Sequence, residues 1–156
     1  MAVFIAFLNE LLLALFLPTI SKAVPWSGEV LTKDNPAVKL VRYPFRSDHP
    51  QRELAQRQMA MGGAVVTATL KATQAQTYSF CKNLHYFKMA ESLGGIESLV
   101  CHPATMTHAS VPQETKLKIG ITDSLIRFSV GCEDIEDLSA DLNQALGNIS
   151  WLKEIY

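Results

Sequence analysis

Between residues 38 and 146, short apolar segments with strand character alternate with segments whose apolar residues recur at helical spacing. The alternating or β-branched segments predict strands at Val38–Tyr43, Ala64–Leu70, Tyr86–Met89, Ile96–Val100 and Leu125–Val130. The remaining segments predict helices at Gln51–Met59, Thr73–Leu84, Pro112–Ile119 and from Ile135 to about Leu146. This order indicates an α+β fold in which helices cover one face of a small sheet.

Local signals within two of these helices lead to more specific expectations. Asp48 is a plausible N-cap for the helix that begins near Gln51, with Pro50 in its first turn. In the helix at 73–84, Ala75, Tyr78 and Cys81 are expected on the buried face. The acidic residues between Glu133 and Asp137 complement the dipole at the start of the last helix, so they indicate helix capping and not a metal site.

The composition is that of a globular chain without the basic patch that nucleic-acid binding needs. The 156 residues are enough for one domain, or a domain plus an arm, and 48% of them are hydrophobic while 19% are charged. The net charge of −1 and the pI near 6.4 leave no excess of basic residues for binding nucleic acid. Cys81, Cys101 and Cys132 are odd in number and widely spaced, which is typical of reduced core thiols in a cytoplasmic protein.

The N-terminal twenty residues, MAVFIAFLNELLLALFLPTI, are the most apolar part of the chain. We interpret residues 1–23 as an apolar helical arm, with a signal-like segment as the alternative because Ser21-Lys22-Ala23 has small residues at cleavage spacing. Asn9 and Glu10 interrupt the apolar run, which leaves it too short for a membrane-spanning helix. A short helix is expected at Val24–Asn35. The main domain is expected at 24–148, followed by a tail at 149–156.

Two stretches contain most of the unusual polar residues. In MAESLGGIESLVCHPATMTHAS (89–110), Glu91 and Ser92 lead into Gly94-Gly95, where the backbone is free to adopt positive φ or to approach a ligand closely. Arg127 lies inside the apolar run from Leu125 to Val130. A buried arginine is either paired with an acidic residue or available to a carboxylate, and the residues alone favour an internal ion pair with Asp123 or Glu133.

The histidines and cysteines do not form a metal-binding pattern. Cys81 and His85 are at helical spacing, but the chain has no C-x-x-C motif to complete a zinc site. We therefore predict no metal, and we assign structural hydrogen-bonding roles to His49, His85 and His102.

These motifs resemble the C-terminal domain of the Cys/Met-metabolism (transsulfuration) family of PLP-dependent enzymes. The likeness lies in AESLGGIESLVCHPATMTHAS and GITDSLIRFSVGCEDIEDLSADLNQAL, and it extends upstream to VRYPFRSDHPQRELAQRQM. The family includes cystathionine γ-synthases, cystathionine γ- and β-lyases, methionine γ-lyases and homoserine sulfhydrylases. The resemblance implies the small, mostly antiparallel sheet, covered by helices on one face, of the C-terminal domain in fold-type I PLP enzymes.

The resemblance also implies roles for four residues. Arg127 matches the arginine that holds the α-carboxylate of the substrate amino acid. Ser92 matches a serine that helps to orient the cofactor-bearing lysine and so touches the cofactor site indirectly. Glu91 matches a glutamate near the substrate side chain, and Thr107, in the MTHAS motif, matches a residue lining the same site. The implied substrates are cystathionine, homocysteine or cysteine, or activated homoserine, and the reactions are β- or γ-elimination or γ-replacement.

The cofactor of this family is pyridoxal 5'-phosphate, and most of its binding site belongs to the family's N-terminal domain. No lysine here stands in the family's Schiff-base context, although Lys22 faintly resembles it. We therefore expect a C-terminal fragment that is inactive alone and that needs an N-terminal PLP domain or a homo-oligomeric partner. The alternatives are one half of a split enzyme that is active with a second chain, and a repurposed interaction module without catalysis.

Overall fold

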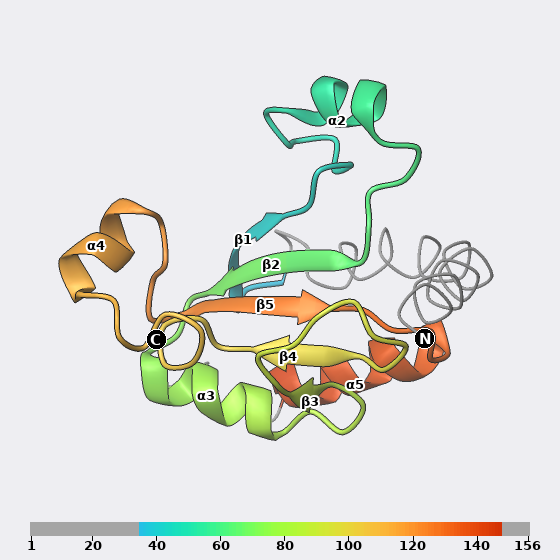
Figure 1. Ribbon diagram of the computed structural model, residues 1–156. Helices are drawn as coiled ribbons and strands as arrows, with labels where there is room; N and C mark the ends of the chain where they lie inside the picture. The colour runs from blue at the N-terminus through green and yellow to red at the C-terminus, as the bar shows by residue number, and fades with distance from the viewer. Residues whose placement is uncertain (1–34, 148–156) are drawn as a thin grey trace, which may run out of the picture.

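A computed structural model of the chain describes residues 35–147, and in this range it shows the α+β fold expected from the sequence. The sheet contains five strands: β1 (Val38–Arg42), β2 (Val65–Leu70), β3 (Lys88–Met89), β4 (Leu99–Cys101) and β5 (Leu125–Ser129). They are arranged in the order β1-β2-β5-β4-β3, and every neighbouring pair is antiparallel except β3 and β4. The central strand is therefore β5, the last in the chain (Figure 1).

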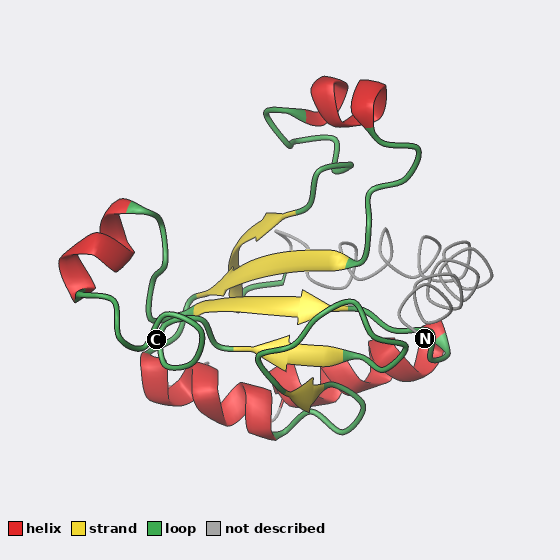
Figure 2. Ribbon diagram, in the orientation of Figure 1, coloured by secondary structure: helices red, strands yellow, loops and turns green. Residues whose placement is uncertain are grey.

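Two helices lie along one face of this sheet, as Figure 2 shows below the strands: α3 (Gln74–Lys82) and α5 (Ile135–Gly147). The core fills the space between them and the sheet. Alternate residues of the central strands enter it, so that Val66 and Ala68 of β2 and Ile126 and Phe128 of β5 are almost completely buried. We call the other face, to which Arg127 and its neighbours in register belong, the open face.

Of the three residues that we predicted on the buried face of helix α3, only Cys81 is buried. Thr77, Phe80 and Cys81 are its buried residues, whereas Ala75 and Tyr78 are exposed. Spacings of three and four residues place Thr77, Phe80 and Cys81 on one side of the helix, and the phenylalanine ring contributes the largest apolar area on that side. Phe80 packs edge-on against Phe128 at 6.4 Å between ring centroids, which fixes the rotation of the helix.

Two short helices stand away from the sheet on the side of the open face (Figure 1): α2 (Arg52–Gln58) and α4 (Gln113–Lys118). The expectation that Asp48 caps α2 was wrong. The N-cap of α2 is Gln51, without a side-chain hydrogen bond, and the Asp48 carboxylate is paired with Arg46 at 2.9 Å. Asp48 lies too far before the helix to reach its free N–H groups, and the nearby guanidinium is the stronger partner.

The predictions for the two ends of the chain, namely the apolar arm at 1–23, most of the helix at Val24–Asn35 and the tail at 149–156, lie outside the described residues. Within residues 35–147, no helix is long and apolar enough to cross a membrane.

Candidate carboxylate-binding site

Arg127 lies in the middle of the open face, on the central strand β5. Its neighbours in register are Thr67 on β2 and Cys101 on β4. The Arg127 guanidinium reaches over β4 and donates from Nη2 to the backbone carbonyls of Glu91 and Ser92, at 3.1 Å and 3.0 Å. The structure therefore brings together three of the four residues that we predicted for the site.

The ion pair that the residues alone favoured for Arg127 does not form. The Glu133 carboxylate instead accepts hydrogen bonds from the backbone N–H and the hydroxyl of Ser98. Asp123 accepts from the side-chain amide of Gln113 at 3.3 Å. Among the described residues, Arg127 has no acidic partner, so its positive charge is compensated only by carbonyl dipoles.

The Nε atom of Arg127 is buried and has no hydrogen-bond partner in the described part of the chain. Buried N–H groups are nearly always paired, because leaving one unpaired costs about 1–3 kcal/mol. The two carbonyls engage only Nη2, which leaves Nε and the other guanidinium N–H groups without a recorded acceptor. A carboxylate oxygen is a strong acceptor for an N–H group of a charged guanidinium.

The backbone that holds Arg127 belongs to the 91–98 loop, which connects β3 to β4. Gly94 adopts a φ of 77° and donates its N–H to the Ser129 hydroxyl at 2.8 Å. Because Ser129 is two residues after Arg127 on β5, the two side chains project from the same face of the strand and hold the same loop. Sequence reasoning missed this role of Ser129, since a serine at the end of a strand gives no local signal for a contact 35 residues away.

The side chains of Glu91 and Ser92 are exposed, and no hydrogen bond is recorded for either. Thr107 is also exposed, and its hydroxyl is bonded to Nδ1 of the neighbouring His108 at 2.8 Å. The described residues show no hydrogen bond between Thr107 and Arg127, so its role in the site remains a prediction.

His102 has the structural role that we predicted. It is fully buried, with Nε2 at 2.8 Å from the Asp123 carbonyl and Nδ1 at 2.7 Å from the Thr105 hydroxyl. A carbonyl only accepts, so Nε2 carries the proton and Nδ1 accepts from Thr105. The imidazole therefore fixes the turn after β4 to the segment before β5 and has no free nitrogen for catalysis.

Two of the three free cysteines are buried, namely Cys81 and Cys101, and Cys132 is half-buried. Burial, together with the neighbouring Cys101, raises the pKa of the Cys81 thiol to about 12. These two thiols are inert core residues at neutral pH. Within residues 35–147, no three His, Cys, Asp or Glu side chains are grouped in a way that would hold a metal ion.

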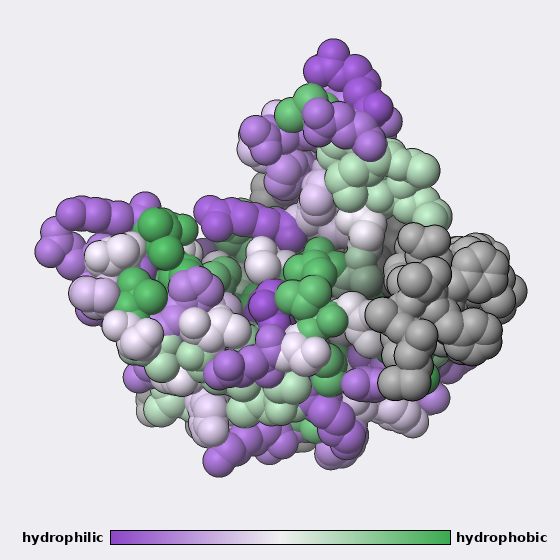
Figure 3. Space-filling model, in the orientation of Figure 1, coloured by the Kyte–Doolittle hydropathy of each residue, from purple (hydrophilic) through white to green (hydrophobic). Residues whose placement is uncertain are grey.

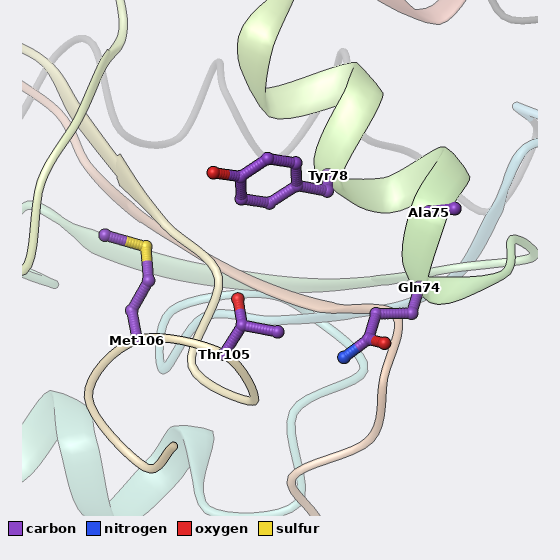
Figure 4. A pocket seen from close by; sticks show the side chains of 5 residues that line it. All are labelled: Gln74, Ala75, Tyr78, Thr105 and Met106. Carbon is purple, nitrogen blue, oxygen red and sulfur yellow. The ribbon is translucent and has the colours of Figure 1, made fainter.

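A pocket of about 380 Å³ lies between α3 and the turn after β4, away from Arg127. Figure 4 shows its lining, with Gln74, Ala75 and Tyr78 on the helix and Thr105 and Met106 on the turn. None of the residues predicted for the site lines this pocket. It is a shallow surface feature built largely from exposed side chains.

The described residues do not fit PLP by themselves. The cofactor needs a lysine amine, an acidic partner for its ring nitrogen and a phosphate pocket. Lys116 is the one buried lysine in the described range, and its amine donates to the carbonyls of Ala104 and Ala109. These contacts hold the Lys116 amine at α4, and no described lysine contacts Arg127 or the 91–98 loop, so the described residues place no lysine at the site.

Comparison with known proteins supports the resemblance seen in the sequence. The profile of the family described as "Cys/Met metabolism PLP-dependent enzyme" matches residues 28–147. The cystathionine gamma-lyase of Dictyostelium discoideum is 52% identical over 112 residues, which cover 72% of this chain and 29% of that protein. The cystathionine beta-lyase of Coxiella burnetii is 48% identical over 112 residues, with the same coverage of 72% and 29%.

The fold agrees with a solved structure of the same group. The cystathionine gamma synthase of Xanthomonas oryzae, in complex with aminoacrylate and cysteine, superposes with a TM-score of 0.79 at 38% identity. The match covers 83% of this chain and 33% of that protein. The chain belongs to the Cys/Met-metabolism family of PLP-dependent enzymes, and it spans about 30% of the length of the curated relatives that it matches.

Proposed function

We propose that residues 35–147 form the domain that binds the substrate α-carboxylate in a PLP-dependent enzyme of sulfur amino-acid metabolism. The observation that carries the proposal is the Arg127 guanidinium, which two loop carbonyls hold in place while its buried Nε has no partner. Relatives are described as cystathionine lyases and synthases, and one solved relative, from Lactobacillus plantarum, is complexed with L-serine. Cystathionine and L-serine are both amino acids with an α-carboxylate.

Arg127 supplies binding and orientation in this proposal. Nη2 is committed to the 91–98 loop, so the guanidinium plane cannot rotate freely when a ligand arrives. A charge-assisted N–H···O bond from Nε to one carboxylate oxygen would fix the position of the carboxylate next to the guanidinium and so help to set the direction of the α-carbon. Fixing a reacting centre in this way lowers the entropic part of the activation barrier.

Ser92, Glu91 and Thr107 have secondary roles in the same proposal. The backbone carbonyls of Ser92 and Glu91 bind Arg127, whereas the side chains of both residues are exposed. These side chains are therefore available to the rest of the site. We assign Ser92 to the orientation of the cofactor-bearing lysine, Glu91 to the distal part of the substrate and Thr107 to the site lining. The reactions proposed are β- or γ-elimination or γ-replacement at the carbon that bears sulfur or an activated oxygen.

The lysine and the phosphate pocket come from a cofactor domain outside residues 35–147, and PLP then supplies the electron sink for the reaction. We therefore expect these residues to bind an amino acid weakly and not to catalyse a reaction without the cofactor domain.

The test is calorimetric titration of the chain with L-serine and L-cysteine, comparing the wild type with Arg127→Lys. Lysine keeps the charge but loses the planar fork, so we expect affinity to fall by about tenfold or more. Arg42→Lys is the matched control, because Arg42 is an exposed arginine on the same face, two strands away in the same register. Equal affinity in the wild type and Arg127→Lys would overturn the proposal.

A further inference from the structure

The far end of the 91–98 loop is held by a partly buried hydrogen-bond network built around Glu133. The Glu133 Oε1 atom accepts the Ser98 backbone N–H at 2.7 Å, and Oε2 accepts the Ser98 hydroxyl at 2.7 Å. Ser98 is fully buried, and its oxygen in turn accepts the Gly131 N–H at 2.9 Å. One carboxylate therefore joins the end of the loop to the segment that follows Arg127 on β5.

The two segments approach so closely that only glycine fits at position 131. A Cβ atom there would collide with the Ile96 carbonyl oxygen and with the Glu133 carboxylate. The same Ile96 carbonyl accepts the Cys132 N–H at 2.9 Å. Residues 96–98 are therefore fixed against residues 131–133 by hydrogen bonds and by close packing.

In addition to the backbone bond between Cys132 and Ile96, three side chains attach the 91–98 loop to β5 and the segment that follows it. Arg127 bonds to the carbonyls at one end, Ser129 holds Gly94 in the middle, and Glu133 holds Ser98 at the other end. The attachment by Glu133 has the shortest hydrogen bonds of the three, with two of 2.7 Å from Ser98 to one carboxylate.

We propose that Glu133 is a positioning residue for the carboxylate site, acting on Arg127 through the 91–98 loop. By fixing Ser98, Glu133 fixes the path of the loop, and so it keeps the carbonyls of Glu91 and Ser92 where they orient Nη2 of Arg127. This inference rests on the proposed function. It assigns Glu133 a role beyond helix capping. The capping bond at the start of α5 is made by Asp134, which accepts the Glu136 N–H at 2.8 Å.

The variants for the test are Glu133→Gln and Glu133→Ala, with Glu136→Gln as the matched control. Glu136 is exposed and belongs to the same acidic run, so its replacement changes the charge equally without touching the loop. Glu133→Gln has the same shape and retains one acceptor for the Ser98 N–H, which keeps the test informative if Glu133→Ala fails to fold.

The first readout needs no ligand. Hydrogen exchange at the Gly94 amide, which is bonded to Ser129 and not to Glu133, reports the middle of the loop, and we expect it to become about tenfold faster in Glu133→Gln. The second readout is the dissociation constant for L-serine, which we expect to rise by about tenfold, since small displacements of a supporting residue have effects of this size. Both should be larger in Glu133→Ala and unchanged in Glu136→Gln.

The outcomes separate this inference from the proposed function. Unchanged Gly94 exchange in both Glu133 variants would overturn the positioning role, as would unchanged affinity for L-serine. If the wild type binds no amino acid, the proposed function fails, while Gly94 exchange still decides whether Glu133 controls the loop. If Glu133 has a merely structural role, its replacement should lower the global stability. The Gly94 exchange and the affinity of the folded protein for L-serine should then be the same as in the wild type.

Discussion

At the scale of single residues, the buried polar side chains are almost all paired. Ser98, His102, Lys116 and Asp141 are each buried and each hydrogen-bonded. In the described part of the chain, the buried side-chain atoms without a partner are Oγ1 of Thr122 and Nε of Arg127. Since most buried polar groups here are paired, the unpaired N–H of Arg127 supports our proposal that it binds a ligand.

Cys81 leads to a prediction about alkaline stability. Its pKa is raised from 9.0 to about 12 by burial and by Cys101, so the folded chain retains this proton over a range in which the unfolded chain has lost it. The stabilisation is complete below pH 9 and is lost as the pH rises toward about 12. In Cys81→Ala, the free energy of unfolding should fall less steeply in this range, by up to about 1.4 kcal/mol per pH unit.

Chemical denaturation at pH 8.5 to 11 measures this slope. Cys132→Ala is the control, since Cys132 is only half-buried and should leave the slope unchanged. The same slope in the wild type and Cys81→Ala would show that the Cys81 thiol does not carry this pH dependence.

At the scale of elements, α5 is fixed to the sheet by more than its apolar face. Leu138, Leu142, Ala145 and Leu146 are buried, at the helical spacing of an apolar face. Asp141, on the same side, is also buried, and it accepts the backbone N–H groups of His85, Tyr86 and Phe87 at 2.7 to 3.3 Å. This carboxylate joins α5 to the segment that leads into β3.

Asp141→Asn should therefore destabilise the fold. An amide has one acceptor oxygen and would turn an N–H toward a backbone N–H that needs an acceptor, at a cost of about 2–3 kcal/mol. Thermal or urea unfolding measures the loss, and Glu136→Gln on the exposed side of α5 should change stability by less than about 0.5 kcal/mol. A loss in Asp141→Asn no greater than in this control would contradict the assigned role.

The elements were more predictable from the sequence than their contacts. The strand segments have β-branched or apolar runs, so all five appeared where expected, within a few residues of their observed ends. The rotation of α3 and the roles of Asp48 and Glu133 could not be predicted in the same way. Each depends on a partner outside its own local pattern, such as Phe128 for Phe80 or Ser98 for Glu133.

At the scale of the whole molecule, the sheet is covered unequally. Helices α3 and α5 cover one face of the sheet. Arg127 lies on the open face, and the short helices α2 and α4 lie on the same side, away from the sheet (Figure 1). Figure 3 shows apolar surface on α4 and near the middle of this view. The most exposed large apolar residues are Leu93, Ile96, Leu117 and Ile119, each more than half exposed. Such surfaces are usually buried against another domain or chain.

We therefore expect the chain to self-associate through these residues when no other domain covers them. Sedimentation velocity at increasing concentration should show a rising average mass, and the double variant Leu117→Ser and Ile119→Ser should reduce it. The control is Leu54→Ser on α2, which removes a single apolar side chain that is less exposed than Leu117 or Ile119. Concentration-independent monomer in the wild type would contradict this prediction.

Arg127 was identifiable from the sequence because the motif around it resembles that of the family, whereas its residue context alone favoured a wrong ion pair. The central claim is that its free N–H groups receive a carboxylate. The most direct measurement is the Nε–H resonance of Arg127, assigned by nuclear magnetic resonance and followed while L-serine is added. A saturable shift with slower proton exchange at Arg127, and none at Arg42, is the result that we predict. No shift at Arg127, or an equal shift at both arginines, would contradict the claim.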